Sequence, residues 1–261
     1  MIKVEKITST LETKYLGREI RYFQKLSSTN TVAKKYAEKG AKEGTVIVAE
    51  IQTQGRGRLN RPWISPKGGV WLSIILRTKI ASEEAPKITL ITSVAVANTL
   101  HRLYGLKTRI KWPNDVLIDG KKVCGILTEA STNGKNVNVI VVGIGINANF
   151  NLKALPDNLR VTATTLKEAL RKHVDREKLI CALLKEFEGC CKLFKEKKTK
   201  RSLEEWREMT DFLGKKIEVT SFEEKWLGRA IDIDESGALI VELENNERRR
   251  VLSGDVTVRA I

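Results

Sequence analysis

The segment "QTQGRGRLNRPW" (residues 52–63) combines two closely spaced glycines with three arginines and ends at Trp63. Successive backbone N–H groups of a glycine-rich turn can form a concave anion-binding site, and arginine adds a planar, permanently charged fork that matches phosphate. The segment lacks the GxxxxGK[ST] pattern of a P-loop, and it is not followed by the helix that a dinucleotide-binding fingerprint requires. The sequence therefore predicts an anion-binding loop, with a solvated basic turn as the alternative.

Other motifs carry residue types suited to the same chemistry. "KWPND" ends with Asn114 and Asp115 at the start of a predicted strand, where a carboxylate near basic residues could coordinate Mg²⁺ or orient a nucleophile. Lys122 follows an Asp-Gly turn, and a hairpin at that turn would bring its ammonium back beside Asp115. "GIGIN" places Asn147 at the end of an apolar strand. Taken singly, each motif could equally be an ordinary turn or strand end.

The composition excludes several kinds of site. The chain has only two histidines, so a histidine-based metal centre or a Ser-His-Asp triad is improbable, and chemistry would rely on Lys, Arg, Asp and backbone groups. The four cysteines form no CxxC pair that would indicate a zinc clamp. Because we find neither a signal peptide nor an apolar run of about 18 residues, we expect a cytoplasmic protein without membrane contact.

The basic residues are unevenly distributed along the chain, whose formal net charge is +15. Residues 51–114 contain eleven Lys and Arg against two Asp and Glu, whereas residues 214–261 contain eight against ten. A basic patch attracts nucleotides, nucleic acid or acidic protein partners, so the charge alone does not choose among them. A generally lysine-rich surface could explain part of the excess.

The elements that would position these motifs can be read from spacing and turn residues. Ser28 or Thr29 caps a helix that ends at Gly40, and a second, mostly apolar helix runs from Pro86 to Gly105. Apolar strands precede and follow the arginine loop, and Asp-Gly and Asn-Gly turns at 119–120 and 133–134 predict an antiparallel meander. Residues 165–213 return to helix. Short, regularly spaced strands after residue 214 predict a small β-barrel.

We therefore expect an α/β (α+β) protein with a mainly antiparallel mixed sheet and flanking helices. The predicted division is a catalytic domain at 1–213 and a small C-terminal barrel at 214–261.

The motifs occur in the order SSTN, QTQGRGRLNRPWISPKGG, KWPND, KKVCGIL and GIGIN, and this order resembles that of the biotin protein ligases. The resemblance extends from about Phe23 to Arg259, and the GRGR loop joined to KWPND is its most specific part. It implies a catalytic domain like that of class II aminoacyl-tRNA synthetases and biotin ligases, followed by an SH3-like barrel. It also implies ATP-dependent biotinylation of a carrier-domain lysine through biotinyl-5′-AMP, with Mg²⁺ accompanying ATP.

The resemblance also implies roles for individual residues. Lys122, Arg58 and Asp115 would be catalytic, and a metal would lie near Asp115, although its ligands cannot be named. Residues that would bind biotin are Ser28, Thr29, Asn30, Gln52, Gly55, Arg56, Arg58, Lys122 and Gly125. Residues that would bind ATP are Arg56, Arg58, Arg61, Trp63, Asn114, Lys122, Asn147 and Arg259. One position departs from the family pattern: many members have glycine where this chain has Asn60, and asparagine tolerates left-handed backbone better than most residues.

The implied partner is the biotin carboxyl carrier protein or domain of a carboxylase or decarboxylase, and we expect a homodimer. Some relatives carry an N-terminal DNA-binding module of about sixty residues, whereas only some 22 residues precede the first predicted catalytic strand here, so we expect no specific DNA binding. Two alternatives remain: lipoate or octanoyl transfer on the same fold, and a nucleic-acid-binding module that uses the basic 51–114 region. The second alternative would need exposed aromatic residues between the basic residues. Trp63 and Trp71 support it only weakly, because both also suit loop packing or the core.

Overall fold

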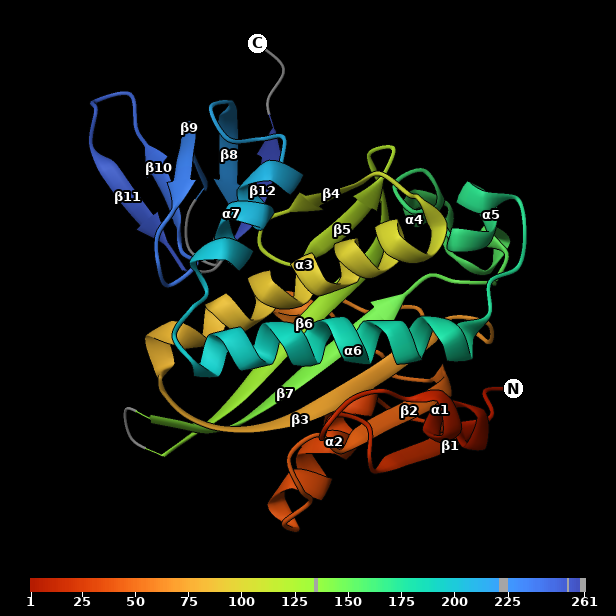
Figure 1. Ribbon diagram of the computed structural model, residues 1–261. Coiled ribbons are helices and arrows are strands. Elements are labelled where there is room, and N and C mark those ends of the chain that lie inside the picture. The colour runs from red at the N-terminus through yellow and green to blue at the C-terminus, as the bar shows by residue number, and fades with distance from the viewer. Residues whose placement is uncertain (134–135, 221–224, 253, 259–261) are drawn as a thin grey trace.

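A seven-stranded mixed sheet forms the centre of the protein in the computed structural model, which describes residues 1–133, 136–220, 225–252 and 254–258 (Figure 1). The strand order is β1-β2-β3-β7-β6-β5-β4. Only β1 and β2 pair in parallel; every other neighbouring pair is antiparallel. The strands are β1 (Ile20–Leu26), β2 (Val46–Gln52), β3 (Val70–Ala81), β4 (Thr108–Lys111), β5 (Asp115–Ile118), β6 (Lys121–Asn133) and β7 (Asn136–Ile146).

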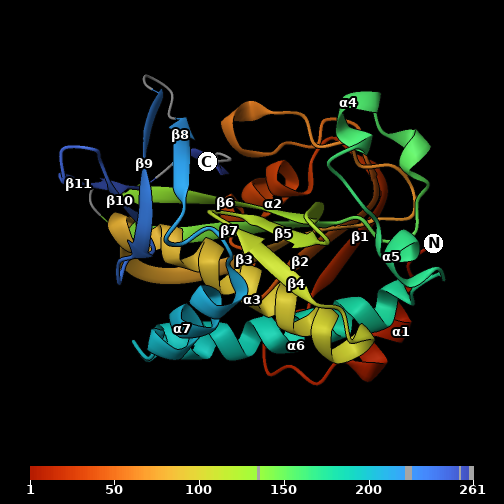
Figure 2. The ribbon, with the colours of Figure 1, turned by 90° about the horizontal axis from the view of Figure 1, so that it is seen from above.

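Helices cover both faces of this sheet (Figure 2). On one face lie α3 and α6, which pack on each other and bury the larger apolar cluster, and on the other lies α2, whose Ala33 and Ala37 pack against Ile47, Ile75 and Val141. Neighbouring strand residues therefore serve opposite faces, as the period of two in a β-strand requires. The helices are α1 (Val4–Thr10), α2 (Thr29–Glu38), α3 (Ala85–Tyr104), α4 (Asp157–Arg160), α5 (Leu166–Leu170), α6 (Arg176–Lys195) and α7 (Lys200–Met209).

The C-terminal part is a five-stranded antiparallel sheet in the order β11-β10-β9-β8-β12. Within the described residues its ladder ends at β11 on one side and at β12 on the other, so no strand pairing there closes the sheet into a barrel. Its strands are β8 (Lys216–Thr220), β9 (Lys225–Ile233), β10 (Leu239–Glu242), β11 (Arg248–Val251) and β12 (Asp255–Val258).

Contacts join this C-terminal sheet to the rest of the molecule. The Trp112 indole N–H donates to the Gly237 carbonyl at 3.3 Å, and the Arg58 guanidinium donates to the Gly254 carbonyl at 3.1 Å. The second contact links the arginine loop directly to the residue before β12. The division into two domains at residue 214 stays a prediction.

The predicted elements agree with the fold, with small shifts at their ends. The α2 helix starts at Thr29 after the cap residue Ser28. The α3 helix ends at Tyr104 and is capped by Gly105, whose φ of 66° is the left-handed value that favours glycine. The antiparallel arrangement of β4 to β7 is confirmed, while the predicted turn residue Gly134 lies outside the described residues. The short helix α1 was not predicted, because its seven residues give too little periodicity.

Candidate active site

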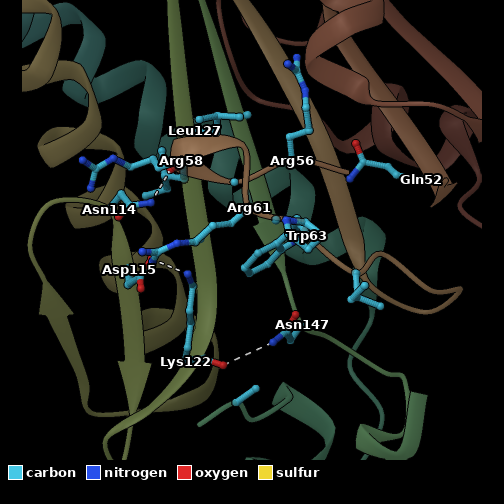
Figure 3. Close-up of a pocket in the computed structure, with 18 of the residues that line it drawn as sticks. Gln52, Arg56, Arg58, Arg61, Trp63, Asn114, Asp115, Lys122, Leu127 and Asn147 are labelled. Atoms are coloured by element: carbon cyan, nitrogen blue, oxygen red, sulfur yellow. Dashed lines mark hydrogen bonds and ion pairs between the residues drawn. The ribbon is translucent and has the colours of Figure 1, made fainter. Parts of the chain in front are cut away.

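One cavity of about 530 Å³ opens beside the arginine loop and contains most of the predicted site residues (Figure 3). It lies over the carboxyl-terminal half of β7 and the start of β6, with α2 at one end and the β4–β5 turn at the other. Of the predicted residues, those lining it are Ser28, Thr29, Asn30, Gln52, Arg56, Arg58, Arg61, Trp63, Asn114, Asp115, Lys122, Gly125 and Asn147.

At one end of the cavity, Lys122 and Asp115 form an ion pair. The Lys122 Nζ atom lies 2.7 Å from the Asp115 Oδ1 atom and 4.9 Å from the centre of a Trp63 ring. The predicted hairpin explains the first contact, since β5 and β6 are antiparallel neighbours joined through Asp119 and Gly120. Both side chains are partly exposed, at 31% for Lys122 and 21% for Asp115, so an anionic ligand can reach the ammonium.

The main chain at Lys122 is held by a segment that the sequence motifs did not reveal. The Lys122 N–H donates to the Thr162 carbonyl at 2.8 Å, and the Thr164 N–H donates to the Lys122 carbonyl at 2.9 Å. The Asn147 amide nitrogen donates to the carbonyls of Lys122 and Thr164, at 3.3 and 3.0 Å. Asn147 therefore lines the cavity but uses its amide donors to position the lysine.

Glycines on two adjacent strands form the floor of the cavity. Gly125 of β6 pairs with Gly145 of β7, and the Trp63 ring lies across both. A Cβ atom on Gly145 would lie 2.5 Å from the Trp63 Nε1 atom, and one on Gly125 would lie 3.0 Å from the same side chain. These glycines are required because the indole approaches the backbone too closely for any side chain.

The opposite end of the cavity is a buried network of neutral polar groups. The Gln52 Oε1 atom accepts from the Thr29 N–H at 2.7 Å and from the Thr29 hydroxyl at 3.0 Å, while Gln52 Nε2 donates to Ser65 at 2.8 Å. The Ser73 hydroxyl lies 2.7 Å from Thr29 Oγ1 and 2.6 Å from Asn30 Oδ1. Elements β2, β3 and α2 thus fix these groups before any ligand enters.

The three loop arginines point in different directions (Figure 3). Arg56 points away from Lys122, toward α2, and its Nη2 atom lies 3.3 Å from the Thr31 hydroxyl and 3.6 Å from Glu129 Oε1. Arg58 reaches past Asn114 to the C-terminal sheet, and Arg61 extends toward Asp115. For Arg56 to bind biotin and ATP as predicted, its side chain would therefore have to turn toward the Lys122 end of the cavity.

The backbone of the loop turns where the sequence departs from the family pattern. Asn60 has a φ of 56°, in the left-handed region, as expected for a position where relatives have glycine. Leu59 precedes it with a φ of 55°, and the Arg61 N–H closes the turn onto the Arg58 carbonyl at 3.1 Å.

Two predicted site residues are not among those lining the cavity. Gly55 is buried under the loop, where a Cβ atom would lie 2.3 Å from the Trp63 carbonyl oxygen, so its place is structural. Arg259 lies outside the described residues. Lining residues that the motifs did not single out come from the 155–163 segment and from the sheet, and include Leu155, Leu159, Ala163, Leu72 and Leu127.

The thiol of Cys124 on β6, two residues after Lys122, is fully buried and is not available as a nucleophile. Burial raises the pKa of the Cys124 thiol, although the nearby Lys122 charge opposes that rise, so the thiol stays protonated. In the described part of the chain, no three His, Cys, Asp or Glu side chains come together as a metal site, and no helix there is long and apolar enough to cross a membrane. The arrangement is suited to binding and orienting two reactants.

Comparisons with known proteins agree with this geometry. Residues 22–147 match the biotin/lipoate A/B protein ligase family, and residues 212–259 match the biotin protein ligase C-terminal domain. The chain is 37% identical to the bifunctional ligase/repressor BirA of Bacillus subtilis over 94% of its own length and 76% of that protein. It is 38% identical to the biotin–[acetyl-CoA-carboxylase] ligase of Paracoccus denitrificans over 43% of its length and 48% of that protein.

A solved structure shows the same fold. The biotin protein ligase of Aquifex aeolicus in complex with biotin and ATP superposes with a TM-score of 0.77 at 29% identity, covering 93% of this chain and 99% of that one. The fold, the cavity and these similarities agree with the order of motifs along the sequence. The chain belongs to the biotin protein ligase family.

Proposed function

We propose that this enzyme activates biotin with ATP as biotinyl-5′-AMP and then transfers biotin to one lysine of a carboxylase carrier domain. The observation that carries the proposal is the division of one cavity into a neutral, hydrogen-bonding end and a cationic end. A cyclic urea, which has N–H donors and a carbonyl acceptor, suits the network of Ser28, Thr29, Asn30 and Gln52. The carboxylate of the same molecule would then extend over the glycine floor toward Lys122.

In the first step, a biotin carboxylate oxygen attacks the α-phosphorus of ATP. A new P–O bond forms, the bond to the β-phosphate oxygen breaks, and pyrophosphate leaves. Lys122 would contact the reacting carboxylate and phosphate, where its charge stabilises the negative charge that builds up. Arg58 and Arg61 would bind phosphate oxygens, and Asn114 lies beside them on the β4–β5 turn. The enzyme contributes positioning and charge, so the reaction needs no covalent enzyme intermediate.

In the second step, the amine of the acceptor lysine attacks the carbonyl carbon of the mixed anhydride. An amide bond forms, AMP leaves with the electron pair of the broken C–O bond, and the amine loses a proton. Asp115 is the carboxylate that lines this end of the cavity, so we propose that it orients the incoming amine. Its 2.7 Å contact with Lys122 holds the carboxylate in place.

The protein groups at the cavity fit Mg²⁺ only when the phosphates of ATP provide further ligands. Among the described residues that line the cavity, Asp115 is the only carboxylate, and magnesium is typically bound by one or two carboxylates together with substrate phosphates. We therefore propose that Asp115 provides the protein contact while ATP provides the remaining charged oxygens. The ion would supply neutralisation of phosphate charge.

The name of the Paracoccus denitrificans relative supports an acetyl-CoA carboxylase as the source of the acceptor domain. We also propose a homodimer, because an edge strand of the main sheet, such as β4, could pair with a strand of a second copy. We propose a cytoplasmic location, because the acceptor carboxylase would be located there.

Biotin-dependent exchange of labelled pyrophosphate into ATP tests the first step directly. We expect exchange with biotin and none with lipoate, because the fixed polar network requires a ring with N–H donors. Isothermal titration with biotin gives an independent measurement. Exchange driven by lipoate, or the absence of biotin binding, would refute the proposal.

A further inference from the structure

Glu129 lies next to the cavity without lining it, and it contacts both the neutral end of the site and the arginine loop. It is on β6, with 19% of its side chain exposed. Its Oε2 atom accepts a 2.7 Å hydrogen bond from the Asn30 amide, and its Oε1 atom lies 2.5 Å from Lys34 Nζ and 3.6 Å from Arg56 Nη2. One carboxylate thus touches a residue of the neutral end and a residue of the arginine loop.

The contact with Glu129 fixes which way the Asn30 amide faces. The Asn30 Nδ2 atom donates to Glu129 and, at 3.1 Å, to the Leu127 carbonyl, so both of its hydrogens are used. The amide oxygen must then face the other way, where it lies 2.6 Å from the Ser73 hydroxyl and beside Gly143, which lines the cavity. Asn30 therefore offers an acceptor at the neutral end.

The same carboxylate restrains the loop through Arg56. The guanidinium lies against Glu129 and Thr31, which holds it away from the Lys122 end of the cavity. Two cations share this carboxylate, which is 19% exposed, whereas the Lys34 and Arg56 side chains are 35% and 38% exposed. The Arg56 contact is therefore partly screened by solvent and can be broken. An anionic ligand at the cationic end would compete with Glu129 for Arg56.

We propose that Glu129 is a positioning residue that sets the Asn30 amide as a hydrogen-bond acceptor for ligand N–H groups and restrains Arg56 until an anionic ligand recruits it. The proposal rests on the proposed function, because a cyclic urea with N–H donors is the ligand class that such an acceptor would select. The role of Glu129 in restraining the arginine loop can be tested without biotin.

Two variants of Glu129 separate the two roles. In Glu129→Gln, the amide oxygen can still accept from Asn30, but the charge that holds Arg56 is gone. In Glu129→Ala, both interactions are lost. Lys34→Met is the matched control, because it removes a cation from the same carboxylate and leaves both Asn30 and Arg56 in place.

Limited trypsin digestion of the protein without ligand measures the restraint, because cleavage after Arg56 and Arg58 requires the loop to open. We expect cleavage several-fold faster in both Glu129 variants and unchanged in Lys34→Met. Equal cleavage rates in wild type and Glu129→Gln would overturn the restraint. This comparison decides that role even if biotin proves not to be the substrate.

Pyrophosphate exchange measures the second role as a split between KM and kcat. We expect the biotin KM of Glu129→Ala to rise about tenfold, the size expected for one lost charge-assisted hydrogen bond, with kcat changed much less. Glu129→Gln should raise KM far less, and Lys34→Met about twofold at most. An unchanged KM in Glu129→Ala, or equal KM increases in both Glu129 variants, would overturn the proposal. If wild-type enzyme shows no biotin-dependent exchange, the proposed function fails instead.

Discussion

The two ends of the cavity are built in different ways. At the neutral end, Thr29, Asn30 and Ser73 are at most 4% exposed, and their hydrogen bonds run between regular elements. The arginines instead stand on a loop, and the Arg56 side chain is 38% exposed and faces α2 rather than Lys122. One end is thus fixed by the sheet and α2, and the other depends on side chains that can change partners.

Desolvation explains this difference. A buried neutral donor or acceptor has to be hydrogen-bonded in the folded protein, so its network is complete before ligand arrives. Burying a guanidinium without an anion would cost far more free energy than burying a neutral group. The arginines therefore remain near solvent and near acidic groups until a phosphate takes the place of those acidic groups. On the proposed function, selectivity for the ring would be preset, whereas the charge clamp would form with its ligand. Substitutions at the two ends of the cavity should therefore have different effects on binding and on catalysis.

The largest effect should come from the fixed cation of the cationic end. We expect Lys122→Met to reduce kcat for pyrophosphate exchange by about 10²–10³-fold, because it removes a donor aimed at developing charge. Biotin binding, measured by calorimetry, should change much less. Lys121→Met, an exposed neighbour on the same strand, is the control. A loss below tenfold would show that the loop arginines can replace the lysine.

A methyl group at the neutral end should disturb binding instead of chemistry. In Gly143→Ala, the new Cβ atom would lie 2.2 Å from the Asn30 Oδ1 atom, so the amide must move. We expect the biotin dissociation constant to rise by about tenfold or more. Gly189→Ala on α6, with no atom within 4 Å of the added carbon, is the control. Normal affinity in Gly143→Ala would mean that this end is more adaptable than its hydrogen bonds indicate.

Loosening the clamp should affect retention of the intermediate. Arg58→Gly removes the contact between the loop and the Gly254 carbonyl and a proposed phosphate contact, so we expect biotinyl-5′-AMP to escape several-fold faster. Mass spectrometry of bystander proteins incubated with enzyme, biotin and ATP would detect the released adenylate as scattered lysine biotinylation. Lys67→Gly, an exposed substitution just after the loop, should leave selectivity unchanged.

The smallest effect is the pH dependence of stability that comes from Glu129, the carboxylate that contacts both Asn30 and Arg56. Burial raises the pKa of Glu129, but the hydrogen bonds from Lys34 and Asn30 and the charges of Lys34 and Arg56 lower it more, so its net pKa is below the ordinary value of 4.5. Its ionised form therefore stabilises the folded protein above that value, and this contribution is lost as pH falls below it.

Accordingly, Glu129→Gln should lower Tm by about 2–4 °C at pH 7, and the difference from wild type should shrink below pH 4.5. Thermal unfolding followed by circular dichroism at both pH values measures it. A difference that grows on acidification would contradict the assigned direction of the pKa shift.

Local sequence explains which parts of the site could be predicted. The Lys122–Asp115 pair depends on one tight turn, so a hairpin signal was enough to place it. The helix cap at Ser28 likewise depends on neighbouring residues only. Together with the order of motifs, these local signals also predicted the mixed sheet and most of its helices.

The contacts that could not be predicted join distant segments. Glu129 contacts Asn30 because α2 packs over β2, β3 and β7, which brings its first turn within reach of β6. The two residues are 99 positions apart in the sequence, and nothing between them signals the contact. The direction of Arg56 follows from the same packing. The segment 155–164 was missed because its apolar residues have no regular spacing, although the Thr162 carbonyl and the Thr164 N–H hold the main chain of Lys122.

The position of Trp63 has an optical consequence. Of the five tryptophans, Trp71, Trp112 and Trp206 are buried in apolar cores, and Trp226 lies on the C-terminal sheet under Arg249. Only the Trp63 ring combines a place in the cavity with a cation 4.9 Å away. Because a nearby charge shifts indole emission, movement of Lys122 toward a ligand anion should change the intrinsic fluorescence of the protein, and the enzyme would report its own adenylate without a label.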